Sequence, residues 1–95
     1  RLRRAFSSNI EFDPAAPREL RKLDRQVARR LLHFLSDRIA HLDDPRSLGE
    51  ALKGSRFGDF WKYRAGDYRI IASIQDKKFL ILVVRIGNRR DVYQR

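Results

Sequence analysis

Cationic and aromatic side chains in the C-terminal half are the residues of this sequence best suited to chemistry. Five of them are Lys62, Arg64 and Arg69, which fall in segments typical of neighbouring strands, and Arg89 and Tyr93, which follow the next such segment. A cluster of cations can bind a phosphate and stabilise the extra negative charge of a pentacoordinate phosphorus. A tyrosine at its rim can stack on an unpaired base. We therefore expect these side chains to converge on one sheet face and to act on a nucleic-acid phosphate.

The overall charge agrees with a polyanionic partner. The 95 residues carry 22 Lys and Arg against 12 Asp and Glu, which gives a net charge of +10. Arginine is the more frequent cation, and its planar guanidinium binds phosphate in two places and stacks on bases. A charge of this size attracts polyanions in general. Nucleic acid, a ribosome and an acidic protein are all compatible partners, and a merely solvated cationic surface is the alternative.

Several classes of site are excluded or disfavoured. The chain has no cysteine, which excludes disulfides, thiolate metal sites and cysteine nucleophiles. His33 and His41 have no neighbours at metal-ligand spacing, and no glycine-rich loop precedes a Lys-Ser or Lys-Thr pair. No apolar run is long enough to span a bilayer, so we expect a cytoplasmic protein that does not contact membranes.

The N-terminal half predicts one strand and two helices. Residues 8–12 alternate as in a strand, and Asp13-Pro14 can begin a short helix, with Pro17 as the other possible start. Asp24 is expected to cap a longer helix, whose apolar residues keep helical spacing as far as the stop at residues 43–45. Residues 45–59 are typical of a loop, with one helical turn expected over residues 48–52.

The C-terminal half changes to the period of strands. We expect strands at residues 60–64, 68–75 and 79–86, and a short strand or extended tail at 91–93. In the first of them Lys62 and Arg64 share one face, and the aromatic residues between share the other. The result is a single α+β domain over residues 1–95, of order β-α-α-β-β-β, with an antiparallel sheet and two N-terminal helices packed on one face.

Several segments together resemble the RelE toxins of bacterial type II toxin–antitoxin systems. The resemblance extends from about residue 10 to the C-terminus, and residues 1–9 are interpreted as an N-terminal extension. Its most specific parts are the Gly-Asp-Tyr-Arg segment and the terminal Gly-x-Arg-Arg-x-Val-Tyr. The segments that carry it are Asp13-Pro14, Leu20-Arg21-Lys22-Leu23, Leu52-Lys53-Gly54, residues 61–71 and residues 84–93.

The resemblance implies a RelE-like fold and a toxin that arrests translation. Such a toxin is a metal-independent and cofactor-free endoribonuclease that cleaves messenger RNA in the ribosomal A site. In that reaction the ribose 2′-hydroxyl attacks its own 3′-phosphate and leaves a 2′,3′-cyclic phosphate. The implied partners are the ribosome, messenger RNA and a RelB-like antitoxin, with which the toxin forms a hetero-oligomer.

The resemblance also assigns roles to single residues. Lys62 is expected to act as the base or as an electrostatic aid, and Arg69 to stabilise the transition-state phosphate. Arg89 is expected to stabilise charge or to protonate the leaving oxygen, and Tyr93 to stack on or orient the substrate. The residues expected to bind substrate are Arg64, Arg90, Lys53 and Arg85.

One departure from the family pattern leaves the proton transfer open. Many relatives have Lys or His where this chain has Asn88, and an amide cannot take up a proton at neutral pH. If that position holds the base in those relatives, Lys62 is the better candidate here. Two other functions stay open: a ParE-like toxin that poisons DNA gyrase, and a non-catalytic nucleic-acid-binding module that uses the same cations.

Overall fold

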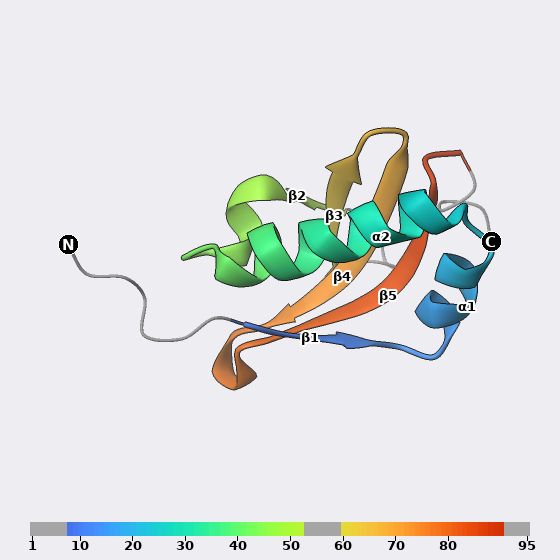
Figure 1. Cartoon of the computed structure of the whole chain (residues 1–95). Coiled ribbons are helices and arrows are strands. Elements are labelled where there is room, and N and C mark those ends of the chain that lie inside the picture. The colour runs from blue at the N-terminus through green and yellow to red at the C-terminus, as the bar shows by residue number, and fades with distance from the viewer. Residues whose placement is uncertain (1–7, 53–59, 91–95) are drawn as a thin grey trace.

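A five-stranded sheet and two helices make up the described part of the chain. The computed structural model describes residues 8–52 and 60–90. The strand order is β1-β5-β4-β3-β2, with the helices α1 (Ala15–Arg21) and α2 (Arg25–His33) between the first two strands in the sequence (Figure 1). The strands are β1 (Asn9–Phe12), β2 (Glu50–Ala51), β3 (Phe60–Ala65), β4 (Tyr68–Gln75) and β5 (Leu80–Asn88).

α2 begins where its capping residue predicts, whereas α1 begins one residue after the expected start at Pro14 and has no side-chain cap. The Asp24 carboxylate accepts a hydrogen bond from the Gln26 N–H at 3.0 Å and caps α2 as expected. The expected long helix is less regular than its periodicity suggests, because α2 continues as a π-helical turn (Phe34–Arg38) and a 3₁₀ turn (Ile39–His41). Within residues 8–52 and 60–90, no helix combines the length and apolar character needed to cross a membrane.

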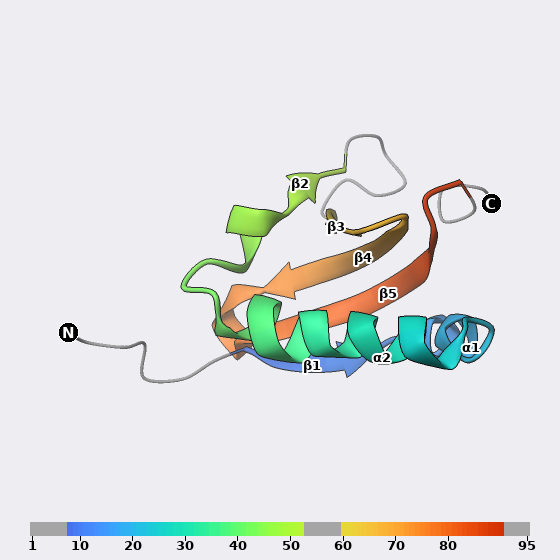
Figure 2. The ribbon, with the colours of Figure 1, turned by 45° about the horizontal axis from the view of Figure 1, so that its top comes forward.

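The core lies between the sheet and the helices. Both helices lie on the same side of the sheet (Figure 2), and Leu31 of α2 and Leu35 of the π-helical turn that continues it are buried there. Sheet residues that meet them, Ile70 and Val83 among them, have no exposed surface. Burial of this apolar face is the main stabilising contribution to the fold. The predicted α+β architecture, with two helices packed on one face, is confirmed.

The direction of one strand differs from the expectation. β3, β4 and β5 form the expected antiparallel meander, but β1 pairs with β5 in parallel, with Ile10 opposite Ile81. The sheet is therefore mixed, and the prediction of a purely antiparallel sheet was wrong on this point. β1 and β5 stand at opposite ends of the sequence, so no turn between them could indicate their relative direction.

The connection after α2 also differs. The helical turn expected over residues 48–52 lies earlier, as a 3₁₀ turn at Pro45–Leu48, and Glu50–Ala51 instead forms the edge strand β2 against β3. The buried Tyr63 holds this connection, since its hydroxyl donates to the Pro45 carbonyl at 2.7 Å. Gly49 packs against the same ring, where a Cβ would lie 3.1 Å from a ring carbon. Contacts with the Tyr63 side chain thus determine the path of the connection between α2 and β3.

A β-bulge in β5 changes the alternation of its side chains between the two faces of the sheet. Ala72 pairs with Val83 and Ile71 pairs with Arg85, which leaves Val84 without a partner in the ladder. Both Val83 and Ile86 consequently face the core although they are three residues apart. Arg85 is turned to the opposite face, which a strict alternation from Val83 would not give it.

Candidate nucleic-acid interface

The strand register brings four of the candidate cations to the face opposite the helices. Arg64 of β3 lies directly across from Arg69 of β4, and Lys62 lies across from Ile71. Ile71 is in turn opposite Arg85 of β5, so that this fully buried side chain lies between two cations. Residues directly opposite one another in a sheet share a face. The pairing therefore places Lys62, Arg64, Arg69 and Arg85 on one surface.

Arg69 is the most enclosed of these cations. Only 8% of its surface is exposed. One guanidinium nitrogen, Nη1, donates to the carbonyl oxygens of Gly66 and Tyr68, each at 2.9 Å. Its described hydrogen bonds thus go to neutral carbonyls of the β3–β4 turn and not to a carboxylate. A buried guanidinium is costly unless an anion compensates it, so this position favours the binding of an external anion.

Lys62 has an acidic neighbour that the sequence did not indicate. Its ammonium nitrogen lies 3.2 Å from a carboxylate oxygen of Glu50, and the two side chains are 20% and 57% exposed. The hydrogen bond and charge of Lys62, followed by the charges of Arg64 and Arg69, lower the pKa of Glu50 below its ordinary value. Glu50 is therefore an ionised counter-ion within the cationic cluster. It escaped prediction because β2 is too short to show alternation.

Arg85, like Lys62, is paired with a carboxylate, but its partner Glu19 is largely buried. Its Nε donates to a carboxylate oxygen of Glu19 at 2.9 Å, and the side chains are 22% and 23% exposed. The other oxygen of the same carboxylate accepts the backbone N–H of Ile86 at 2.7 Å. The charge of Arg85 is thus already neutralised within the protein.

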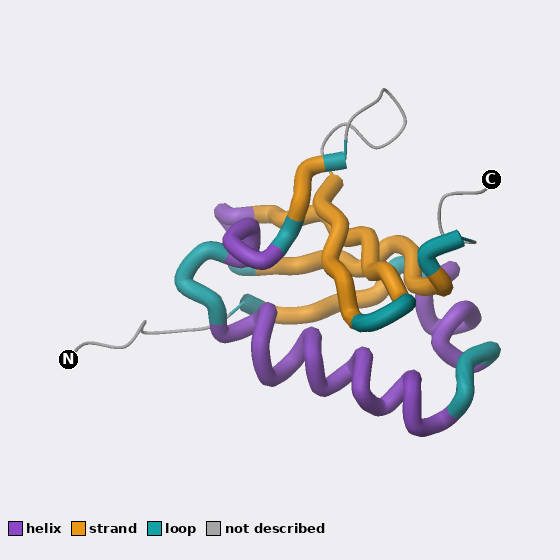
Figure 3. Tube along the Cα trace, turned by 90° about the horizontal axis from the view of Figure 1, so that it is seen from above, coloured by secondary structure: helices purple, strands orange, loops and turns teal. Residues whose placement is uncertain are grey.

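The end of β5 lies beside the β3–β4 turn (Figure 3), and the two are joined by a 2.9 Å hydrogen bond from the Arg89 N–H to the Asp67 carbonyl. Asn88 has a structural task here, because its side-chain oxygen accepts the Arg90 N–H at 3.0 Å. A polar hollow of about 410 Å³ is lined by Asp67, Asn88, Arg89 and Arg90. The exposed Arg89 and Arg90 can therefore reach an anion bound at this end of the sheet.

Two further predicted site residues, Lys53 and Tyr93, lie outside the described residues. The described part of the chain contains no group of three or more His, Asp or Glu side chains arranged to hold a metal ion. What the described cations can do is bind and polarise an anion from several sides at once, with Arg69 as the desolvated donor.

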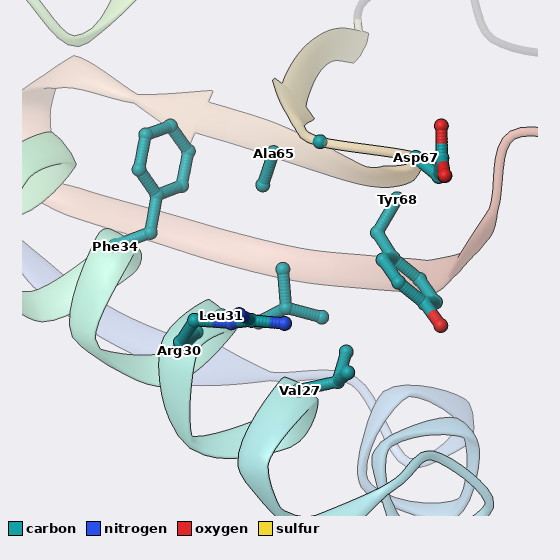
Figure 4. A pocket seen from close by; sticks show the side chains of 8 residues that line it. Val27, Arg30, Leu31, Phe34, Ala65, Asp67 and Tyr68 are labelled. Carbon is teal, nitrogen blue, oxygen red and sulfur yellow. The ribbon is translucent and has the colours of Figure 1, made fainter.

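A second hollow lies on the opposite side of the sheet. It has a volume of about 520 Å³ and separates α2 from the β3–β4 turn. Figure 4 shows Val27 and Leu31 of α2, with Phe34 just after its end, facing Ala65 and Tyr68 of the hairpin. Arg30 is the cation on its rim. This groove is apolar at its base and has a different chemical character from the cationic face.

Comparison with known sequences places the chain in a family. The model of a family described as "ParE toxin of type II toxin-antitoxin system, parDE" matches residues 10–93. The chain is 27% identical over 86 residues to the toxin RelG of Mycobacterium tuberculosis, covering 90% of this chain and 95% of that protein. It is 30% identical over 80 residues to the mRNA interferase toxin RelE of Escherichia coli, covering 84% of this chain and 81% of RelE.

Solved structures agree with the sequence comparisons. The toxin–antitoxin complex RelBE2 of Mycobacterium tuberculosis contains a chain that superposes with a TM-score of 0.82 at 21% identity, covering 95% of this chain and 100% of that one. The isolated RelE toxin of Escherichia coli gives a TM-score of 0.66 at 26% identity, with 90% of both chains covered. The chain therefore belongs to the RelE/ParE superfamily of toxins from type II toxin–antitoxin systems.

Proposed function

We propose that this toxin is a ribosome-dependent endoribonuclease that cleaves messenger RNA in the A site. The observation that carries the proposal is Arg69, a buried cation whose described hydrogen bonds go only to neutral carbonyls, on the same face as Lys62 and Arg64. A scissile phosphate placed there would compensate the buried charge. The similarity to the mRNA interferase RelE supports the same reaction.

The reaction needs no group beyond the RNA itself to form the new bond. The ribose 2′-oxygen bonds to the adjacent phosphorus, the bond to the 5′-oxygen of the next nucleotide breaks, and a 2′,3′-cyclic phosphate remains. One proton leaves the 2′-hydroxyl and one is gained by the 5′-oxygen. The negative charge that accumulates on the phosphoryl oxygens between these events is what Arg69 would stabilise.

The remaining roles follow from position and from the family resemblance. Lys62 would exchange its partner Glu50 for the phosphate and serve as base or electrostatic aid. Arg89 would stabilise charge at the leaving oxygen or protonate it, and Tyr93 would stack on a base. Arg64, Arg90 and Lys53 would bind neighbouring phosphates. The ribosome would supply what a small domain lacks, which is a messenger RNA held with its 2′-hydroxyl in line for attack.

A RelB-like antitoxin is the proposed physiological partner. The related structures include RelB–RelE complexes, and a net charge of +10 calls for a partner that keeps the free toxin off RNA. The apolar groove of Figure 4, with Arg30 on its rim, has the character required by an amphipathic segment with acidic residues.

Primer extension on messenger RNA from cells that express the chain tests the proposal. We expect cuts that follow the reading frame and appear only in translated messages. The same purified protein should cleave messenger RNA on programmed ribosomes. Cells whose messenger RNA stays intact while growth stops would contradict the proposal.

Poisoning of DNA gyrase is the second candidate, favoured by the ParE name of the matching family. The two functions give opposite results in one pair of assays. Gyrase-linked double-strand breaks with intact messenger RNA would establish the second candidate, whereas frame-following cuts with intact DNA would establish the first.

A further inference from the structure

The outer edge of β5 changes its neighbour halfway along. β1 ends at Phe12, which pairs with Val83, and beyond this point α1 lies along β5 in place of a strand (Figure 1). A helix cannot continue the backbone ladder. The N–H groups of β5 that face this edge therefore need side-chain or solvent acceptors.

Glu19 of α1 supplies one such acceptor. One of its carboxylate oxygens accepts the Ile86 N–H at 2.7 Å, and the other accepts Arg85 Nε at 2.9 Å. Both oxygens thus hold consecutive residues of β5, in a position where less than a quarter of the Glu19 side chain is exposed. Charge-assisted hydrogen bonds of this length are among the stronger ones in proteins.

The bulge at Val84 makes this arrangement possible. It turns Arg85 away from the core and leaves Ile86 in it, immediately before the residues that lead into the cationic site. Bulges weaken a ladder locally and bend the strand. The two bonds from Glu19 begin one residue after the bulge, where the strand most needs an external constraint.

The constrained segment carries one side of the site. Gly87 lies directly opposite Arg69, and the Arg89 N–H bonds to the Asp67 carbonyl. A displacement of Ile86 would therefore move Arg89 relative to Arg69. Glu19 itself bonds only to Arg85 and Ile86 among the described contacts.

We propose that Glu19 is a positioning residue that sets where Gly87–Arg90 lies relative to Arg69. Under this proposal, the ion pair with Glu19 makes Arg85 part of the structure that holds β5 in place, and Arg85 is no longer among the residues expected to bind substrate. The inference rests on the proposed function for its catalytic consequence, and its structural consequence can be measured independently of any activity.

Two conservative substitutions separate the effect of the length of the Glu19 side chain from the effect of its charge. Glu19→Asp keeps the carboxylate but shortens the side chain by one methylene, so it cannot span both partners. Glu19→Gln loses the charge but keeps an oxygen at the same distance for the Ile86 N–H. The same two substitutions at Glu11, an exposed residue of β1, serve as matched controls.

The first measurement is single-turnover cleavage on programmed ribosomes. We expect Glu19→Asp to lower the rate constant at saturating ribosome concentration about tenfold, because misplaced catalytic groups slow the chemical step more than binding. The half-saturating concentration should stay unchanged. Glu19→Gln should retain a rate within about threefold of the unsubstituted protein.

The second measurement is hydrogen exchange of the purified full chain. Glu19→Asp should speed exchange of the amides from Ile86 to Arg90 by about tenfold, with the centre of β4 unaffected. Neither Glu11 variant should change the rate constant or the exchange.

Two results would overturn the proposal. One is a Glu19→Asp variant whose amides exchange at the rates of the unsubstituted protein. The other is a Glu19→Gln variant whose cleavage rate constant is as low as that of Glu19→Asp. If Glu19→Asp speeds the exchange as expected but the unsubstituted protein cuts no messenger RNA, the proposed function is refuted and the positioning role of Glu19 remains.

Discussion

The two faces of the sheet differ in the charge of their side chains and in the kind of partner that their buried polar groups have inside the protein. On the helix-covered face the side chains are apolar, and the buried Tyr63 hydroxyl bonds to the Pro45 carbonyl. On the opposite face Arg69 is 8% exposed, and its described hydrogen bonds go to neutral carbonyls only. The helix-covered face is therefore apolar and its buried hydroxyl has a protein partner, whereas we propose that an external anion completes the cationic face. Stability and function should depend on different faces.

The largest expected effect is the loss of activity on the cationic face. Arg69→Ala and Arg89→Ala should each lower cleavage about 100-fold or more, as expected for removal of a transition-state donor, and should abolish growth arrest. Antitoxin binding and the fold should be largely retained. The matched control is Arg29→Ala, which removes the same charge from the exposed side of α2. Full toxicity of either variant would show that the site is assigned wrongly.

A smaller effect, and one on stability, is expected on the helix-covered face. Tyr63→Phe leaves the Pro45 carbonyl without its buried donor, which should lower the free energy of unfolding by about 1–3 kcal/mol in urea titrations. Cleavage by the folded protein should change much less than in the Arg69 variant. If Arg69→Ala proves the more destabilising of the two, the proposed separation between the faces fails.

Alkaline pH provides a second readout of Tyr63. Burial raises the pKa of its hydroxyl from 10.0 to about 12. Because the folded state favours the neutral phenol, this stabilisation is complete below pH 10 and is lost as the pH rises towards 12. The unfolding free energy of Tyr63→Phe should lack this part of the alkaline decline, and an identical pH profile for both proteins would argue against it.

The smallest effect is expected at Glu50, the counter-ion of the cationic face. Glu50→Gln removes the carboxylate that pairs with Lys62 and that, under the proposed function, competes with RNA for it. The half-saturating ribosome concentration should fall about two- to fivefold, with little change in stability, because exposed ion pairs contribute little. A lower rate constant at saturation would instead assign Glu50 to proton transfer.

The elements of this fold were predictable where the signal is local. Asp24 as a cap, the strand at residues 68–75 and the shared face of Lys62 and Arg64 follow from periodicity and capping chemistry. β2 and the path around Tyr63 were not predictable in this way, because two residues show no period. The Val84 bulge is hidden in a nearly continuous apolar run, where alternation cannot be seen.

By itself, the sequence determined the two helices, the three strands of the meander, the family resemblance and the presence of a cationic cluster, since each depends on residue type and short spacing. Only the tertiary structure decided which of these cations has a carboxylate partner. Arg69 and Arg85 have the same chemistry and lie on the same face, yet Glu19 neutralises only Arg85. That difference arises from a contact between residues 66 positions apart, and Coulomb attraction depends on distance in space and not along the chain.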